Sequence, residues 1–159
     1  MTDLLHNYWY IAARERDVRR RPQSITLFGQ PYVVFATGHG QYGALQDRCP
    51  HRNAPLSAGK VCQGQIQCPY HGWRFDHHGA LADIPALAGQ ALPNIHIPSA
   101  HCVAQDGYVW LCVGTPASAA PLPFPHLNEP GWHHFRLRTR FAAPVAQCLE
   151  NFLDCPHAV

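Results

Sequence analysis

Short apolar runs broken by turn residues dominate the hydrophobic pattern of the first two thirds of the chain. The runs are rich in β-branched and aromatic residues, and they read SITLF (24–28), YVVFA (32–36), YGALQ (42–46), WRFD (73–76), ALADI (80–84), HCVAQ (101–105) and YVWLCV (108–113). The segments between the runs, such as GQP, TGHGQ, HHGA and DG, are typical of hairpin turns. Residues 24–113 are therefore predicted to form an antiparallel β sandwich or small barrel.

A proline-rich segment follows this predicted β domain. Five prolines fall within residues 116–130, and such a segment is typical of a stiff, extended linker between domains. Beyond it, the alternating sequence WHHFRLRTRF (132–141) predicts a strand, and residues 143–159 predict the start of a helix with Pro144 near its first turn. The predicted parts are thus a β domain at 1–115, a linker at 116–130 and the beginning of a second domain at 131–159.

Composition and charge narrow the classes of protein that the chain can be. With 159 residues, of which 47% are apolar, the chain can bury one sizeable core. Its 12 Lys and Arg residues against 10 Asp and Glu leave a formal net charge of +2, which argues against nucleic acid as the main partner. The basic cluster RERDVRRR (14–21) is interpreted either as a solvated face or as a docking patch for an acidic redox partner.

The sequence predicts a cytoplasmic protein. Its N-terminus lacks a basic region followed by an apolar one, and no stretch approaches the roughly 18 apolar residues of a membrane span. Seven cysteines are an odd number. Without a secretory signal, they are expected to be thiols or metal ligands, since a disulfide framework is typical of secreted proteins.

Two Cys-Pro pairs, each followed closely by a histidine, stand out among these cysteines. Cys49 and His51 form a C-x-H pair, and Cys68 and His71 form a C-x2-H pair, with sixteen residues between the two pairs. Ligand type alone leaves zinc, copper and iron open. Zinc fingers usually pair like ligands, whereas each segment here pairs one thiolate with one imidazole. Such segments suit a 2Fe-2S cluster in which one iron takes both sulfurs and the other takes both histidines.

The full pattern C-x-H-x16-C-x2-H, present as CPH and CPYHGW followed by RFD, resembles the Rieske 2Fe-2S domain over residues 7–113. The resemblance implies an all-β, Rieske-type antiparallel sandwich with two cluster-binding loops at one end. It also implies that Cys49 and Cys68 bind one iron of the cluster, while His51 and His71 bind the other.

The neighbourhood of the four residues indicates the branch of the family. Rieske proteins of respiratory and photosynthetic complexes carry an extra cysteine in each loop, and these two cysteines form a disulfide. HRNAPL and CPYHG have no such pair, so the chain resembles the ferredoxin and oxygenase branch. The remaining cysteines are then expected to be free structural thiols: Cys62, Cys102, Cys112, Cys148 and Cys155.

The C-terminal sequence ENFLDCPH resembles an element of Rieske non-haem iron oxygenases. Asn151, Asp154 and His157 follow one another at three-residue intervals, so a helix through them would present all three on one face. On its own this trio would be read as a solvated face. The resemblance implies that His157 binds a mononuclear Fe(II), with another histidine about five residues on and a distant carboxylate. Asp154 would be the catalytic residue that links this iron to a cluster histidine.

Taken together, the resemblance implies the N-terminal part of an oxygenase that hydroxylates or O-demethylates its substrate. A reductase or ferredoxin would supply electrons to the 2Fe-2S cluster, and the complete protein would use O2 and a small aromatic or other organic substrate. The assembly would be a homotrimer, and residues 131–159 would be the start, a strand and a helix, of an α+β catalytic domain with an incomplete iron site. A stand-alone ferredoxin-type carrier and a zinc-bound structural module are the alternatives.

Overall fold

The computed structural model describes residues 2–38, 40–137 and 139–154, and the chain divides into two compact units, residues 1–125 and 126–159. The boundary between the units lies inside the proline-rich segment, while the predicted domain limits stay predictions. Among the described residues, no helix is long and apolar enough to cross a membrane.

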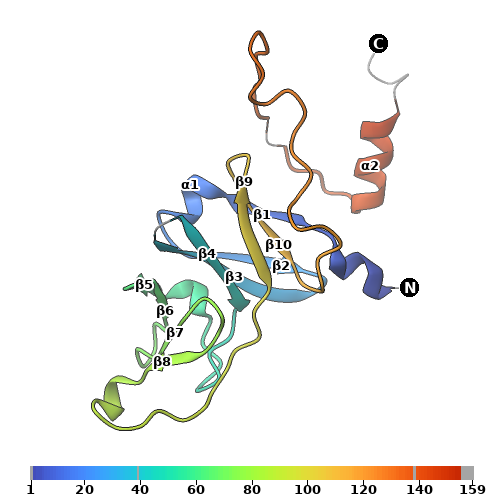
Figure 1. Cartoon of the computed structure of the whole chain (residues 1–159). Helices are drawn as coiled ribbons and strands as arrows, with labels where there is room; N and C mark the ends of the chain where they lie inside the picture. Colours follow the sequence, from blue (N-terminus) through green and yellow to red (C-terminus); the bar gives the residue numbers. More distant parts are fainter. Residues whose placement is uncertain (1, 39, 138, 155–159) are drawn as a thin grey trace. The chain divides into compact units, whose positions relative to one another are not determined.

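The first unit is built mainly from short antiparallel strands (Figure 1). The strands are β1 (Tyr10–Arg14), β2 (Gln23–Leu27), β3 (Gln30–Gly38), β4 (Gln41–Gln46), β5 (Lys60–Cys62), β6 (Gln65–Gln67), β7 (Arg74–Phe75), β8 (Leu81–Asp83), β9 (His101–Gln105) and β10 (Tyr108–Cys112). The helical turns are α1 (Glu15–Val18) and the 3-10 segments η1 (Thr2–Asn7), η2 (Leu56–Ala58) and η3 (Pro85–Leu87).

These strands form three sheets with the orders β1-β10-β9, β2-β3-β4 and β5-β6-β7-β8. Figure 1 shows the β5–β8 sheet, drawn in green, as a lobe beside the strands of the other two sheets. This lobe carries one of the two Cys/His segments between β6 and β7, and the other segment follows β4. The arrangement confirms the predicted all-β class with antiparallel sheets.

Strand β3 lies between two hydrophobic cores. Val33 and Phe35 are fully buried in a core that also contains Cys49 and Cys68. Tyr32 and Val34 are buried in a second core, formed with residues of β4 and β10. Successive side chains of a strand point to opposite faces, so a strand covered on both faces is continuously apolar. The YVVFA run therefore contributes buried side chains to both cores.

Most of the strands expected from the apolar runs are present. All seven runs coincide within about two residues with a strand, and five of them form β2, β3, β4, β9 and β10. The other two runs form only the short strands β7 and β8. Strands β1, β5 and β6 were not predicted, because β1 has no flanking turn signal and the segments KVC and QIQ are too short to show a period.

In the second unit, the helix α2 (Val145–Leu153) begins directly after Pro144, as predicted. The strand predicted at 132–141 is wrong, since the described residues of this segment form none. An alternating pattern makes a strand only where a neighbouring strand satisfies its backbone N–H and C=O groups. The described part of this unit contains no second strand that could do so.

Candidate metal centre

The first Cys/His segment, residues 49–54, is a tight loop closed by its own backbone. The Cys49 N–H donates a hydrogen bond to the Ala54 carbonyl at 2.9 Å, and the Asn53 N–H donates to the Cys49 carbonyl at 2.8 Å. Asn53 has a left-handed backbone with φ of 59°. Asparagine tolerates this conformation better than most residues, and Arg48 Nε donates to Asn53 Oδ1 at 2.7 Å. The loop brings His51 to the surface beside a buried Cys49.

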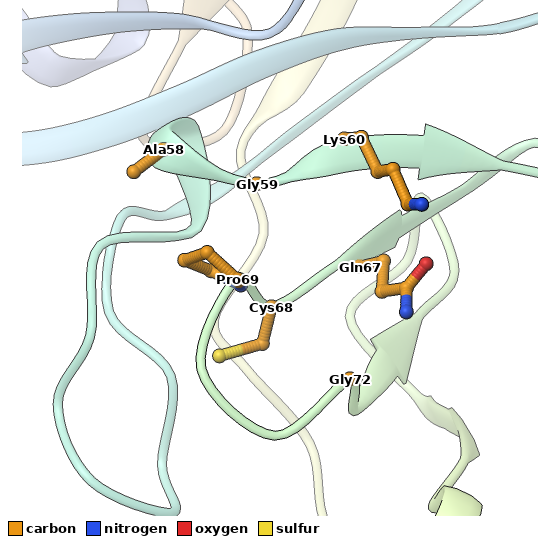
Figure 2. Close-up of a pocket in the computed structure, with 7 residues that line it drawn as sticks. All are labelled: Ala58, Gly59, Lys60, Gln67, Cys68, Pro69 and Gly72. Carbon is orange, nitrogen blue, oxygen red and sulfur yellow. The ribbon is translucent and has the colours of Figure 1, made fainter.

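The second segment, residues 68–73, repeats the same closure. The Cys68 N–H donates to the Trp73 carbonyl at 2.8 Å, and the Gly72 N–H donates to the Cys68 carbonyl at 3.2 Å. Gly72, four residues after the cysteine like Asn53, also has a left-handed backbone, with φ of 74°. A Cβ atom at this position would lie 3.1 Å from Pro85 Cγ, so the site favours glycine. Figure 2 shows Cys68, Pro69 and Gly72 around this loop.

A buried carboxylate holds the start of the first loop in place. Asp47 is 8% exposed and accepts hydrogen bonds from the Ser24 hydroxyl at 2.9 Å and the Ser57 hydroxyl at 2.6 Å. The Ser57 backbone N–H also donates to Asp47, at 2.7 Å. Because these donors lie on β2 and η2, the carboxylate ties both flanks of the loop to the domain. Sequence reasoning missed Asp47, since no local pattern distinguishes it from a surface aspartate.

The two cysteines lie together in the interior. Cys49 is 1% exposed and Cys68 is 3% exposed, and both belong to the core that contains Leu56, Ile66 and Phe75. Burial raises the pKa of the Cys49 thiol to about 11; a backbone hydrogen bond from His51 opposes this rise, and the neighbouring Cys68 thiol adds to it. Since iron binds the thiolate, binding at neutral pH would release the proton of Cys49.

The two histidines lie side by side at the surface. The ring centroids of His51 and His71 are 4.6 Å apart, with the planes tilted by 59°. Trp73, from the second loop, stacks in parallel on His51 of the first loop at 4.7 Å, and Tyr70 lies 3.8 Å from its neighbour His71. The pKa of His51 is lowered by partial desolvation and by the positive charges of His71 and Arg52. The neutral imidazole, the form that binds metals, is therefore favoured.

This donor set fits a two-iron cluster better than a single ion. Two buried sulfurs and two adjacent imidazoles come from loops of the same construction. No group of three or more His, Cys, Asp or Glu residues in the described part of the chain could hold one metal ion. A structural zinc site needs four protein donors around one ion, whereas each iron of a 2Fe-2S cluster with this ligation needs only two.

The other described cysteines form no disulfide. They are Cys62, Cys102, Cys112 and Cys148. Burial raises the pKa of Cys102 to about 12, and the Cys112 thiol donates a hydrogen bond to the His6 carbonyl at 3.3 Å. Cys155 lies outside the described residues. The prediction of free thiols is therefore confirmed for the described ones.

The C-terminal trio is only partly described. Helix α2 ends at Leu153, and Asp154 caps it with a non-helical backbone and donates its N–H to the Glu150 carbonyl at 3.0 Å. The helix therefore contains Asn151 and ends before Asp154. A helix is disfavoured just before a proline, and Pro156 stands two residues further on. His157 lies outside the described residues, so its role stays a prediction.

Comparison with known proteins defines the class to which this fold and site belong. The model of the Rieske [2Fe-2S] domain family matches residues 8–101. The chain belongs to this family, and a Rieske domain implies a 2Fe-2S cluster.

The most similar relatives and structures include several oxygenases. The chain is 35% identical to chlorophyllide a oxygenase, chloroplastic, of Chlamydomonas reinhardtii, over 97% of this chain and 24% of the relative. It is 36% identical to the oxygenase component of dicamba O-demethylase of Stenotrophomonas maltophilia, over 97% and 46%. The structure of dicamba monooxygenase with non-heme iron and dicamba aligns with a TM-score of 0.65 at 36% identity, over 74% of this chain and 36% of that one. The chain thus spans less than half the length of these relatives.

Proposed function

We propose that this chain is the electron-transfer part of a Rieske-type oxygenase. In this proposal Cys49 and Cys68 hold one iron of the 2Fe-2S cluster, and His51 and His71 hold the other. The observation that carries the proposal is the pair of equally closed loops, which place two cysteines together in the core and two imidazoles together at the surface. When bound, the cluster accepts and releases single electrons.

The residues around the cluster site have separate tasks in this proposal. The core around Cys49 and Cys68 excludes water from the thiolates, and the hydrogen bonds of Asp47 keep the first loop in place. Trp73 stacks on the face of the His51 ring, which fixes the orientation in which that ring projects from the surface. The exposed histidine pair is therefore the end of the site from which an electron leaves most directly.

The activity of the whole protein is part of the proposal. The oxygenases among the relatives support an electron route from a reductase or ferredoxin through the cluster to a mononuclear Fe(II). His157 would bind that iron, and Asp154 would accept hydrogen bonds from one cluster histidine and one histidine of the iron site. Substrates would be small aromatic or other organic molecules, oxidised with O2 by a cytoplasmic homotrimer. A stand-alone carrier is not favoured, because the relatives and the structure described above are oxygenases.

Anaerobic purification with iron and sulfide tests the cluster assignment. We expect a red-brown protein with two irons and two sulfides per chain and, after reduction, a rhombic EPR signal of mixed Cys/His ligation. A colourless protein that binds one zinc per chain would contradict the proposal and favour the structural module.

A further inference from the structure

Four basic side chains from two distant segments line one hollow on the first unit. Arg19, Arg20 and Arg21, which follow α1, lie on one side, and Lys60 at the start of β5 lies on the other. The hollow has a volume of about 310 Å³. Its remaining lining residues are uncharged: Val18, Pro22, Ala36, Gly59 and Val61. The basic sequence cluster therefore meets a further cation that is far away in the sequence.

Among the described residues, only one of these four charges is paired with an opposite charge. Arg19 pairs with Glu15, which also accepts a hydrogen bond from the Tyr42 hydroxyl at 2.7 Å. Among the ion pairs found between described residues, none involves Arg20, Arg21 or Lys60, and all three side chains are exposed. The rim of the hollow is thus a positive surface, which we call the basic rim (Arg20, Arg21 and Lys60).

The basic rim is continuous with the second cysteine loop. Gly59 and Lys60 also line the hollow of Figure 2, whose other residues include Gln67 and Cys68. Lys60 is the direct partner of Gln67 in the β5–β6 pair. Opposite Cα atoms in such a pair lie roughly 5 Å apart, and the next Cα along the chain is about 3.8 Å away. Lys60 of the rim is therefore separated from Cys68 by one strand pairing and one position along the chain.

A glycine keeps this connection tight. Any Cβ atom at Gly59 would overlap the backbone carbonyl of Gln67, so the two strands approach without a side chain between them. A protein docked on the rim could therefore come close to the cysteine side of the site. The exposed pair of His51 and His71 would stay free for the electron acceptor.

We propose that the basic rim is the docking surface for an acidic electron-donor protein, which delivers its electron on the cysteine side of the site. This rests on the proposed function. One electron leaves the donor, which is oxidised, and enters the cluster, which is reduced; no covalent bond forms or breaks. The positive charge of the rim and its continuity with Cys68 favour this partner, because complementary charges steer association and raise its rate roughly 10- to 1000-fold.

The test uses a plant-type 2Fe-2S ferredoxin of acidic charge as the donor probe and the cluster-loaded chain as acceptor. Binding is measured with the oxidised ferredoxin, and the rate of electron transfer is measured by rapid-freeze EPR with the reduced one, both as functions of salt. The double variant Arg21→Glu with Lys60→Glu should bind the ferredoxin at least about 10-fold more weakly at low salt and lose most of the salt dependence of the rate. Arg16→Glu, on α1 but outside the hollow, is the matched control and should change either quantity less than about 2-fold.

Three readouts distinguish failure of this inference from failure of the proposed function. A chain without a reducible cluster would contradict the proposed function itself. A cluster that dithionite reduces normally, combined with unchanged ferredoxin binding in the double variant, would overturn the docking surface alone. The same holds if Arg52→Glu, beside His51, weakens binding more than the double variant, because the donor would then dock on the histidine side.

Discussion

The two cysteine loops share one backbone frame but receive different side-chain support. In both, the cysteine N–H and C=O close the loop, and the residue four positions later is left-handed. The first loop uses Asn53, supported by Arg48, where the second uses Gly72. The second loop also sends Trp73 across to His51, while the rings beside His71 are Tyr70 of the same loop and His51 itself. The backbone frame is thus duplicated, whereas loop 68–73 supports both histidines.

Substitution of the four ligands should have the strongest consequences, and it tests whether the two loops contribute equally to cluster binding. Cys49→Ser, Cys68→Ser, His51→Ala and His71→Ala should each abolish cluster binding, because each removes one of the two protein donors to an iron. Iron and sulfide content and visible absorbance measure this loss. Cys62→Ser, a change at the end of β5 outside both loops, should retain a full cluster. A colourless Cys62→Ser protein, or a normally coloured variant at any of the four ligands, would contradict the assignment.

Trp73 and Tyr70 are expected to contribute unequally to the stability of the domain. Trp73→Ala removes the stacking partner of His51 and part of the core packing, so we expect a loss of roughly 2 kcal/mol in the free energy of unfolding. The EPR signal of the reduced cluster should also shift, because His51 would be less well oriented. Tyr70→Ala should cost less than about 1 kcal/mol, since Tyr70 is 64% exposed. Equal effects of the two changes would remove the asymmetry.

The turn residues provide a smaller contrast. Gly72→Ala should destabilise the domain by about 1–2 kcal/mol, because a left-handed backbone is costly for alanine and the added Cβ would crowd Pro85. Asn53→Gly should be neutral within about 0.5 kcal/mol, because relief of the left-handed backbone strain offsets the lost hydrogen bond from Arg48. Anaerobic urea denaturation measures both. A Gly72→Ala protein as stable as the parent would show that the second loop can change its backbone.

The smallest effect concerns the support of the first loop by Arg48. Arg48→Ala should cost about 0.5–1 kcal/mol, because it removes an exposed hydrogen bond to the Asn53 side chain. The same change should be nearly silent in an Asn53→Gly background, where that acceptor is absent. A double-mutant cycle on these two positions measures the coupling directly. Equal costs in both backgrounds would mean that Arg48 acts elsewhere.

The sequence was informative where chemistry limits the choice of residue. Only cysteine and histidine supply these donors, so the pattern of Cys49, His51, Cys68 and His71 indicated the site, and the structure places the two pairs together. The central strands were predictable for a similar reason, since a run buried on both faces must be apolar. The left-handed turn that both loops share could also have been predicted, because Asn53 and Gly72 stand at the same offset from their cysteines.

Other features depend on contacts that no local pattern records. The stack of Trp73 on His51 and the bonds of Asp47 to two serines join segments that meet only after the strands pair. The predicted strand at 132–141 failed for the opposite reason, since its alternation was present but the described residues of its unit form no strand that could pair with it. Helix α2 ends before Asp154, close to Pro156, which disfavours a helix in the residues that precede it.

The shared position of β3 has a consequence for how the domain opens. The cluster-binding core and the second core each cover one face of this strand, so melting either core would leave half of its side chains in water. Partial unfolding of one lobe is therefore costly, and the two cores should lose structure in one cooperative transition. The backbone amides of Val33 and Val34 should accordingly be among the slowest to exchange hydrogen with solvent, even though their side chains face different cores.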